Sequence, residues 1–427
     1  MKKMLFFAMA AAGMLASCSS EDNVEGNNPN ESSLQKIELG VSTVANATTR
    51  GTGTVGGVLD KEEKNEWAGQ DLWVYMLERG KMNIAKYVDP DKNETKVFDN
   101  QKFLAPTSTI SGKEETGTGV ATTFDKSVKY YPVDGQYDFW GYHIDDAYDG
   151  AENGEDPKVI MYDANGSVVA DENNADQATK RVVDVTIKGD QDIMVGKASL
   201  DAGDVEKLGN QPDNYYSAYA ARKGVQPNIT FEHLLTRFTF KVKAGSESAT
   251  GNGDNTEPVY VTGISVKSKN KGHLTVAYTG ERPESLLTFD ETEPVEFELK
   301  ERTSDDQNAK LDKLTETPLT WNSEDGTANT LPIGEALLVA PNETSYELTI
   351  NLSQNVLQTE GGAMQPMKLR QISTLKLDKE MTQKFLAGHS YEVTITVYGL
   401  EKIEVSASLE PWKDGGNIDI DDDVKED

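Results

Sequence analysis

The sequence predicts an all-β protein made of two antiparallel β-sandwich domains with long polar loops and few short helices. Short runs in which apolar and polar residues alternate recur along the chain, whereas helical periodicity is scarce. Clusters of Gly, Asn, Asp and Pro separate these runs, which is typical of antiparallel sandwiches. Since one domain usually takes about 100–200 residues, a chain of 427 residues suits two or three of them.

The predicted strands follow from local residue patterns. The first is an apolar run of strand length, the second is rich in aromatic residues, the third is β-branched, and the last three alternate strictly. They lie at residues 72–77, 137–142, 182–187, 238–242, 348–352 and 393–397. One short helix is expected, at residues 231–236.

Three polar stretches interrupt the strand pattern and are expected to be surface loops. They lie at residues 145–156, 171–180 and 246–256. A domain boundary is expected near residues 223–228, where Gly and Pro interrupt a polar stretch before a new strand run. The predicted domains therefore cover residues 51–226 and 227–427.

Composition excludes several classes of partner and site. The chain carries 72 acidic and 42 basic side chains, a formal net charge of −30. This charge argues against nucleic acid as a partner, because a phosphate backbone needs clustered Lys and Arg, and against electrostatic docking on anionic lipid. A single cysteine excludes an intrachain disulfide and a metal site built from several Cys ligands.

The first residues read as a bacterial export signal, expected at residues 1–17. Lys2 and Lys3 precede an apolar run that is too short for a transmembrane helix, which needs about 20 apolar residues. Cys18 follows in a Leu-Ala-Ser-Cys sequence that resembles the lipobox, whose Cys thiol accepts a diacylglycerol. The alternative is an ordinary signal peptide with a Cys there by chance. We favour the lipoprotein, because the only cysteine stands at the required position, and two or three acyl chains make a durable anchor.

The residues give little sign of catalysis, so we expect neither an enzyme nor a cofactor. No Gly-rich phosphate loop follows a strand and opens a helix, and no Gly-x-Ser-x-Gly turn occurs. A Ser/His/Asp triad stays open, because its members need not be neighbours in sequence, but a structural role is the better interpretation of His233. Residues 89–93 and 163–167 alternate oxygen ligands as calcium loops do, yet both lack the acidic residue at loop position twelve. We therefore expect turns there, and no metal site.

Two short segments near opposite ends of the chain alternate apolar and polar residues. Ile37, Leu39 and Val41 share one face of the first. The second spans residues 403–409, and its apolar positions are Ile403, Val405, Ala407 and Leu409. Such a face can fill an apolar groove while its backbone adds a strand to a neighbouring sheet. The alternative is a pair of ordinary edge strands, which periodicity alone favours.

Arg50 favours strand addition over a pair of ordinary edge strands. It is the first arginine of the chain and lies in a polar stretch of small residues with glycine, which suits proteolysis. A cut between Arg50 and Gly51 would release both the lipid anchor and the strand near residues 37–42. Unpaired backbone groups would then line an open groove, which another alternating strand could fill. After loss of residues 1–50 the net charge is −29, so the charge belongs to the exported part.

Several stretches resemble the fimbrillin family of Bacteroidales, the subunits of type V pili. The most specific is Gly-His-Ser-Tyr-Glu-Val-Thr-Ile-Thr-Val-Tyr-Gly-Leu at residues 388–400. The others are the lipobox at Cys18, Thr-Arg-Gly at 49–51, Tyr-Tyr-Pro at 130–132, Tyr-Asp-Phe-Trp-Gly-Tyr at 137–142, Gln-Asp-Ile-Met at 191–194, Phe-Glu-His-Leu-Leu at 231–235 and Pro-Trp-Lys-Asp-Gly-Gly at 411–416. Together these stretches span essentially the whole chain.

The resemblance implies two transthyretin-like β-sandwich domains and a surface fimbrium as the final location. It implies lipidation at Cys18 and an outer-membrane precursor, a propeptide at residues 18–50, cleavage between Arg50 and Gly51, and polymerisation by donor-strand exchange in support of adhesion. The implied partners are other fimbrial subunits, in a homopolymer with accessory subunits, besides host or bacterial surface ligands. The donor candidate is the segment at 403–409, although it could lie downstream, near 417–421.

Other functions remain open at this stage. The main alternative is a lipid-anchored surface protein that does not polymerise, such as a pilus anchor, a tip or a glycan-binding protein. Trp67 or Trp321 could then form a sugar platform, although core packing is the better interpretation of both. A surface hydrolase is disfavoured by the poverty of catalytic signals. Arg50 argues against an anchor, and a free strand at 403–409 argues for a shaft subunit.

Overall fold

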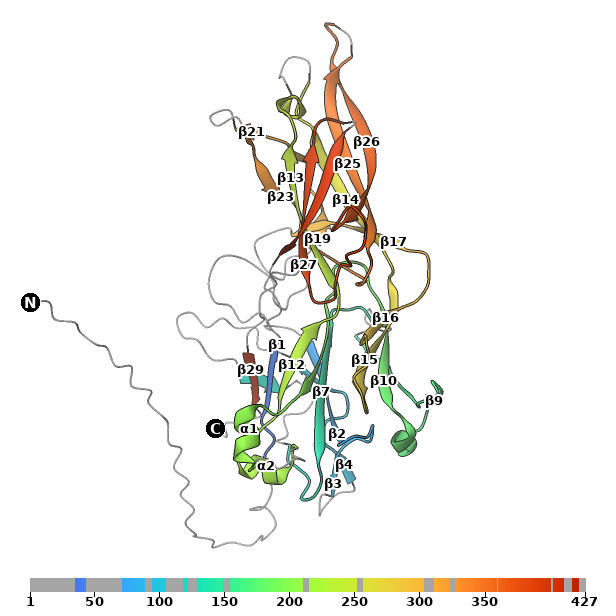
Figure 1. The fold of residues 1–427 in the computed structure, drawn as a ribbon, viewed down its shortest axis with the longest axis vertical. Coiled ribbons are helices and arrows are strands. Elements are labelled where there is room, and N and C mark those ends of the chain that lie inside the picture. Colours follow the sequence, from blue (N-terminus) through green and yellow to red (C-terminus); the bar gives the residue numbers. More distant parts are fainter. Residues whose placement is uncertain are drawn as a thin grey trace, which may run out of the picture.

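The computed structural model consists of two lobes stacked along the long axis of the molecule (Figure 1). The residues that it describes are 35–43, 71–88, 94–104, 118–121, 129–148, 150, 154–209, 215–251, 256–302, 311–322, 327–358, 360–400, 402–410 and 417–421. The protein is all-β with a few short helices, which confirms the expected fold class. Cys18, Arg50, Gly51 and Trp67 lie outside the described residues, as does the calcium-like segment at 89–93.

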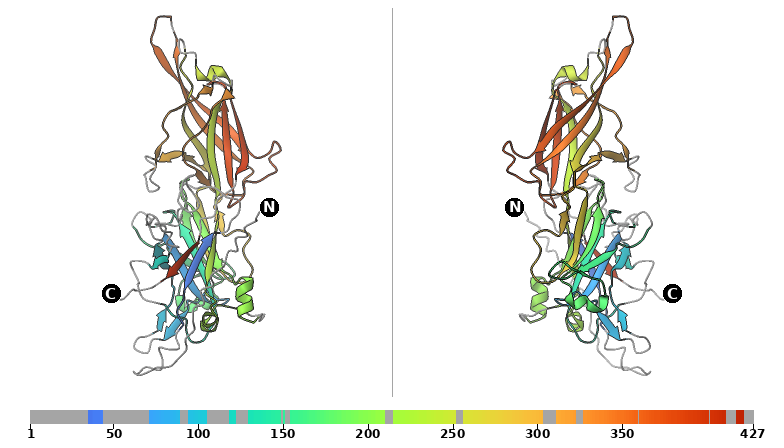
Figure 2. Two further views of the ribbon diagram at one scale, coloured as in Figure 1. Left: turned by 90° about the vertical axis from the view of Figure 1, so that its left-hand side faces the viewer. Right: turned by 90° about the vertical axis from the view of Figure 1, so that its right-hand side faces the viewer.

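Eight strands of the lower lobe close into a barrel. In order around the barrel they are β1 (Leu39–Thr43), β12 (Asn228–His233), β11 (Ile193–Ala198), β7 (Tyr137–Ile144), β2 (Asp71–Glu78), β5 (Gln101–Leu104), β6 (Thr118–Ala121) and β29 (Asn417–Asp421). Most neighbours are antiparallel, but β1 is parallel to β12, and β29 is parallel to β6. Strands from the two ends of the chain, β1 and β29, therefore lie side by side (Figure 2).

A second sheet of the lower lobe covers one side of the barrel. Its order is β16 (Leu287–Phe289), β15 (Lys271–Tyr278), β10 (Lys180–Thr186), β8 (Val159–Tyr162) and β9 (Val168–Val169). This covering explains why β2 reads as a continuous apolar run. Its alternate side chains Leu72, Val74 and Met76 belong to the barrel core, whereas Trp73, Tyr75 and Leu77 belong to the core that continues into the second sheet.

The upper lobe is a sandwich of two sheets. The first has the order β23 (Thr330–Pro332), β13 (Thr236–Ala244), β27 (Ser390–Val397) and β28 (Ile403–Glu410), with β24 (Leu337–Val339) also paired to β13. The second has the order β17 (Val295–Glu298), β14 (Tyr260–Ser268), β25 (Ser345–Leu357) and β26 (Met364–Lys376), with β20 (Thr317–Pro318) paired to β14. The side chain of Phe238, on β13, is fully buried between these sheets and contacts the rings of Tyr346 and Phe385 edge-on.

The remaining elements are short. Two-stranded ribbons are formed by β3 (Lys86–Val88) with β4 (Glu94–Lys96), β18 (Lys300–Arg302) with β19 (Leu311–Lys313), and β21 (Trp321–Asn322) with β22 (Thr327–Ala328). The helices are α1 (Ala202–Lys207), α2 (Ala218–Arg222) and the 3-10 helices η3 (Glu172–Gln177) and η4 (Glu247–Thr250). Asp201 and Ser217 cap α1 and α2 by accepting hydrogen bonds from backbone N–H groups of the first turn.

The helix expected at residues 231–236 is wrong. This segment contains the end of β12, a two-residue bend and the start of β13. Burial in β12 alternates, and Phe231 is fully buried in the barrel core. A short apolar run fits both a buried helix and a buried strand, so its pattern alone does not distinguish them.

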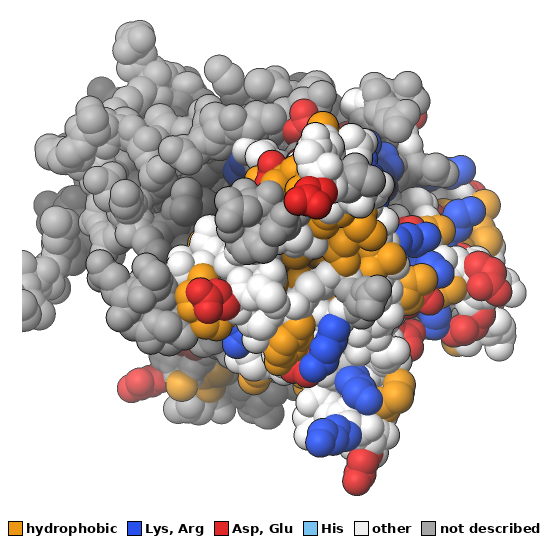
Figure 3. Space-filling model, turned by 90° about the horizontal axis from the view of Figure 1, so that it is seen from above, with side chains coloured by type: hydrophobic (Ala, Val, Ile, Leu, Met, Phe, Trp, Pro, Cys, Tyr) orange, Lys and Arg blue, Asp and Glu red, His pale blue; other side chains and the backbone are white. Residues whose placement is uncertain are grey.

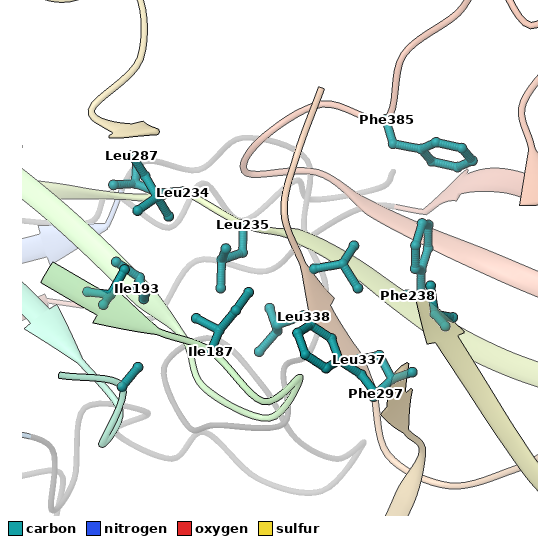
Figure 4. Close-up of a cluster of buried hydrophobic side chains, with 14 of the residues drawn as sticks. Ile187, Ile193, Leu234, Leu235, Phe238, Leu287, Phe297, Leu337, Leu338 and Phe385 are labelled. Carbon is teal, nitrogen blue, oxygen red and sulfur yellow. The ribbon is translucent and has the colours of Figure 1, made fainter. Parts of the chain in front are cut away.

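A continuous apolar cluster joins the two lobes (Figure 4). The connection between β10 and β11 carries Ile187 toward Leu337 and Leu338 of β24, and the backbone N–H of Leu338 donates to the Gly189 carbonyl at 2.7 Å. Gly189 has a φ of +101°, and a Cβ there would lie 2.9 Å from the Phe297 side chain. Only glycine fits this position without a shift.

Strands on both sides of the expected domain boundary share sheets. β12 and β15 come from the second half of the chain but pair with strands of the first half, and β16 joins the same sheet as β10 through β15. The division between residues 226 and 227 therefore stays a proposal. If it holds, strands from both sides of it share sheets of the lower lobe. In the part of the chain that the structure describes, no helix is long and apolar enough to span a membrane.

Candidate functional site

The position that β1 occupies in the barrel is the candidate site for subunit assembly. β1 lies between β12, with Gly40 opposite Asn228, and β29, with Leu39 opposite Ile420. The side chains of Ile37 and Leu39 are 3% and 2% exposed and belong to the barrel core. The alternate side chains Ile37 and Leu39 therefore cover part of the barrel core. Val41 continues the strand opposite Ile229.

Backbone groups and one side-chain amide hold residues 35–38, which lead into β1, in place. The Ile37 N–H donates to the Lys129 carbonyl at 2.9 Å, and the Tyr131 N–H donates to the Gln35 carbonyl at 2.9 Å. The Gln226 side chain contacts two backbone groups of the segment, accepting from the Glu38 N–H at 3.2 Å and donating to the Lys36 carbonyl at 3.1 Å. These contacts hold the segment to strands and loops distant in sequence.

Several aromatic rings belong to the same buried cluster as Ile37 and Leu39. Tyr131 and Phe139 lie edge to face with ring centroids 6.1 Å apart, and Phe139 and Tyr216 do so at 5.6 Å. Burial raises the pKa of the Tyr131 and Tyr216 hydroxyls, so both stay protonated at neutral pH. Loss of the β1 segment would open this apolar cluster, to which another apolar strand could bind.

The first donor candidate, residues 403–409, is the strand β28. It pairs antiparallel with β27 along its whole length, from Ile403 opposite Val397 to Glu410 opposite Ser390. The half-buried side chains of Ile403, Val405 and Ala407 pack against the core, whereas Leu409 is 58% exposed. Among the described strands, β28 lies at the edge of its sheet, as the alternative of an ordinary edge strand expects.

The surface of the upper lobe exposes further apolar side chains. Met367 and Ile372 of β26 are 45% and 59% exposed. Seen from above, hydrophobic side chains lie at the surface between Lys and Arg side chains (Figure 3). The half-buried Trp321 packs against the core, as expected in preference to a sugar platform.

The second donor candidate, β29, lies in the barrel and not in the upper lobe. It is antiparallel to β1 over four residue pairs and parallel to β6 over three. Residues 411–416 link it to β28. Its alternating Ile418 and Ile420 are the sequence signal for this strand, but nothing local in the sequence indicates β1 as its neighbour.

Two histidines and two carboxylates form a buried polar network at the ends of β7, β11 and β12. The Asp192 carboxylate contacts His233 Nδ1 at 2.8 Å, and the Asp145 carboxylate contacts His143 Nε2 at 3.1 Å. His143 Nδ1 also lies 2.7 Å from the Asp71 carbonyl. Burial raises the pKa of Asp192, but His233 and His143 lower it more, so that it lies below its ordinary value.

This network links elements that are distant in sequence. The Asp192 N–H donates to Asp145 Oδ2 at 3.0 Å, which ties the start of β11 to the turn after β7. His233 thus has the structural setting that its sequence context suggests. Within the described residues, no group of three or more His, Cys, Asp or Glu is placed to hold a metal ion.

The calcium-like segment at residues 163–167 is a turn. Asp163 Oδ1 accepts hydrogen bonds from the backbone N–H groups of Asn165 and Ser167, both at 2.8 Å. Gly166 follows with a φ of +81°, as such a turn requires. The carboxylate is therefore used within the loop, as expected from the sequence.

Comparison with known proteins gives a family. A family model described as fimbrillin-like matches residues 61–412. No curated protein matches. Among solved structures, a protein from Bacteroides ovatus for which a role in cell adhesion has been suggested is 13% identical, with 89% of this chain and 98% of that chain covered and a TM-score of 0.38.

The fimbrial anchor protein Mfa2 from Porphyromonas gingivalis is 10% identical, with 89% of this chain and 100% of that chain covered and a TM-score of 0.27. A protein from Bacteroides thetaiotaomicron with a suggested adhesin role is 8% identical, with 89% and 98% covered and a TM-score of 0.34. These scores are too low to carry an argument, so the assignment rests on the family model, which matches most of the chain. The protein belongs to the fimbrillin-like family.

Proposed function

We propose that this protein is a structural subunit of a surface fimbrium. It is exported as a lipoprotein through Cys18, cut between Arg50 and Gly51, and polymerised by donor-strand exchange in support of adhesion. The observation that carries the proposal is the place of β1: the segment before Arg50 contributes one strand to a closed barrel and covers its core.

Loss of this segment costs free energy that a strand from another copy can restore. Exposing a buried Ile or Leu side chain costs about 1.5–3 kcal/mol, and Ile37 and Leu39 are both buried. The Pro227 carbonyl, which accepts a hydrogen bond from the Gly40 N–H at 2.9 Å, and the facing edge of β12 lose their partners when the segment leaves. An alternating strand supplied by a neighbouring subunit satisfies both needs.

Two segments compete for the donor role. The first candidate, with Ile403, Val405, Ala407 and Leu409, is paired throughout with β27, so its donation would break a complete ladder of the upper lobe. Residues 417–421 form a shorter strand outside that lobe and could leave with less disruption. We keep both as candidates; truncation after residue 416 distinguishes them, because it removes only the second.

The charge supports an unbundled polymer. The subunit that starts at Gly51 carries −29, so neighbouring fibres of such subunits repel one another at low ionic strength. The same repulsion acts between the subunits of one fibre, and strand insertion must overcome it. Assembly should therefore become faster as salt screens the subunits.

The test of this function is the dependence of assembly on Arg50. We expect the full chain to form an oligomer ladder that resists mild SDS after treatment with an arginine-specific protease, and Arg50→Ala to stay monomeric under the same treatment. Arg79→Ala, which removes an exposed arginine of the barrel, should polymerise normally. A ladder from Arg50→Ala, or no ladder from the cut wild type at high concentration, contradicts the proposal.

The chain on cells offers a second readout. An N-terminal Gly51 on protein taken from the surface agrees with processing and assembly. An uncut chain that keeps its lipidated Cys18 would indicate instead the alternative function, a pilus anchor or another lipid-anchored surface protein.

A further inference from the structure

The pairing of β1 with β29 connects the proposed cleavage to a second event. β29 has two neighbours in the barrel: β1 contributes four of its residue pairs, from Leu39–Ile420 to Ser42–Asn417, and β6 contributes three. More than half of the pairing of β29 is therefore with the segment that lies upstream of Arg50.

The pairing that would remain is weak for three reasons. β29 and β6 are parallel, and parallel pairs are slightly less stable per residue than antiparallel ones. β6 is itself joined to β5 by only two residue pairs, Phe103–Ala121 and Leu104–Val120. Without β1, β29 becomes the edge strand of the opened sheet, with one side of its backbone unpaired and its link to the rest of the sheet running through those two pairs.

We propose that β1 and β29 form a mutual lock in the uncut subunit. While β1 is present, β29 is held inside its own barrel and β12 is occupied. Removal of β1 empties the place beside β12 and at the same time releases β29 from the barrel. One cut thus makes the acceptor site and mobilises the last strand together, and neither is available before it.

The release has a defined reach. Residues 411–416 tether β29 to β28 in the upper lobe, and the seven steps from residue 410 to residue 417 span at most about 25 Å. A released β29 is therefore restricted to the neighbourhood of its own subunit. This inference rests on the proposed processing at Arg50, but it concerns the coupling of the two strands and not the polymerisation that follows.

Hydrogen exchange measured on the full chain tests the release without a protease. Gly40→Pro removes the N–H that donates to the Pro227 carbonyl and disrupts β1 in the uncut chain. We expect amides of residues 417–421 to exchange at least about tenfold faster in this variant, because pairing with β1 is their main protection. Glu38→Ala, which changes an exposed side chain of the same segment, should leave them protected, and β27 should be unaffected in both variants.

A cross-link tests the register of the lock. Opposed residues of an antiparallel pair have Cα atoms about 4.5–5.5 Å apart, which suits a disulfide. The pair Ser42→Cys with Asn417→Cys should therefore oxidise in the uncut chain, whereas Ser42→Cys with Asp421→Cys, four register positions away, should not. Cys18 is replaced by Ser in both variants.

The outcomes separate this inference from the proposed function. Unprotected amides at 417–421 in the uncut wild type, equal exchange in Gly40→Pro and wild type, or failure of the Ser42–Asn417 cross-link would overturn the lock, whatever the protease does. A chain that passes these tests but forms no ladder after cleavage would keep the lock and reject the polymer function.

Discussion

Replacing Phe238 with alanine is expected to lower the free energy of unfolding of the upper lobe by about 3–5 kcal/mol. The ring is fully buried, and the centroids of Phe385, Tyr346 and Tyr391 lie 5.1, 5.2 and 6.2 Å from its own. Alanine would remove these ring contacts and leave a cavity that two rigid sheets cannot close. Urea unfolding followed by near-ultraviolet circular dichroism of the aromatic cluster measures the loss.

The matched control is Ile372→Ala on β26, whose side chain is 59% exposed. This exposed position should change the free energy of unfolding by no more than about 0.5 kcal/mol. A loss below about 1 kcal/mol for Phe238→Ala would contradict the packing described for the upper lobe.

The stability of the lower lobe is expected to fall as the pH rises from 6 to 10, through His143. Burial lowers the pKa of this imidazole, but the carboxylate of Asp145 and the carbonyl of Asp71 raise it more, to about 9. The ordinary value is about 6.5. Because the folded state binds the proton more tightly, the stabilisation is complete below pH 6.5 and disappears as the pH passes 9. The shift corresponds to about 3 kcal/mol.

Urea midpoints measured at several pH values for wild type and His143→Gln test this expectation. Glutamine does not titrate, so the gap in unfolding free energy between the two proteins should narrow by about 3 kcal/mol between pH 6 and 10. His389→Gln is the control, since His389 Nδ1 contacts a backbone carbonyl, that of Ala387, and not a carboxylate. Parallel pH profiles of wild type and His143→Gln would contradict the proposed charge state of the network.

Local patterns predict much of the fold. The alternating runs at 238–242, 348–352 and 393–397 all lie in strands, namely β13, β25 and β27. The apolar run at 72–77 is likewise a strand, β2, and its lack of alternation reflects burial on both faces. The helix at 231–236 fails because a six-residue apolar segment has too few turns to show which period it follows.

The candidate site was only partly predictable. Alternation identified Ile37 and Leu39 as one apolar face, and these side chains are buried in the barrel. Alternation also indicated a strand at 403–409, and the family resemblance made it the donor candidate, but neither could show that β27 pairs with that strand along its full length. Pairing partners lie far apart in sequence, and period two says which face a residue takes but not which strand lies beside it.

The sequence by itself determined the strand-rich class, and the proposals of lipidation at Cys18 and cleavage at Arg50 rest on it alone, since both depend on residues that are neighbours in the chain. Tertiary structure decided that β1 and β29, from opposite ends of the chain, share an edge and close one barrel. The physical reason is that backbone hydrogen bonds between strands carry no sequence code of their own. Their choice of partner follows from which apolar faces can be buried together, and that is a property of the whole fold.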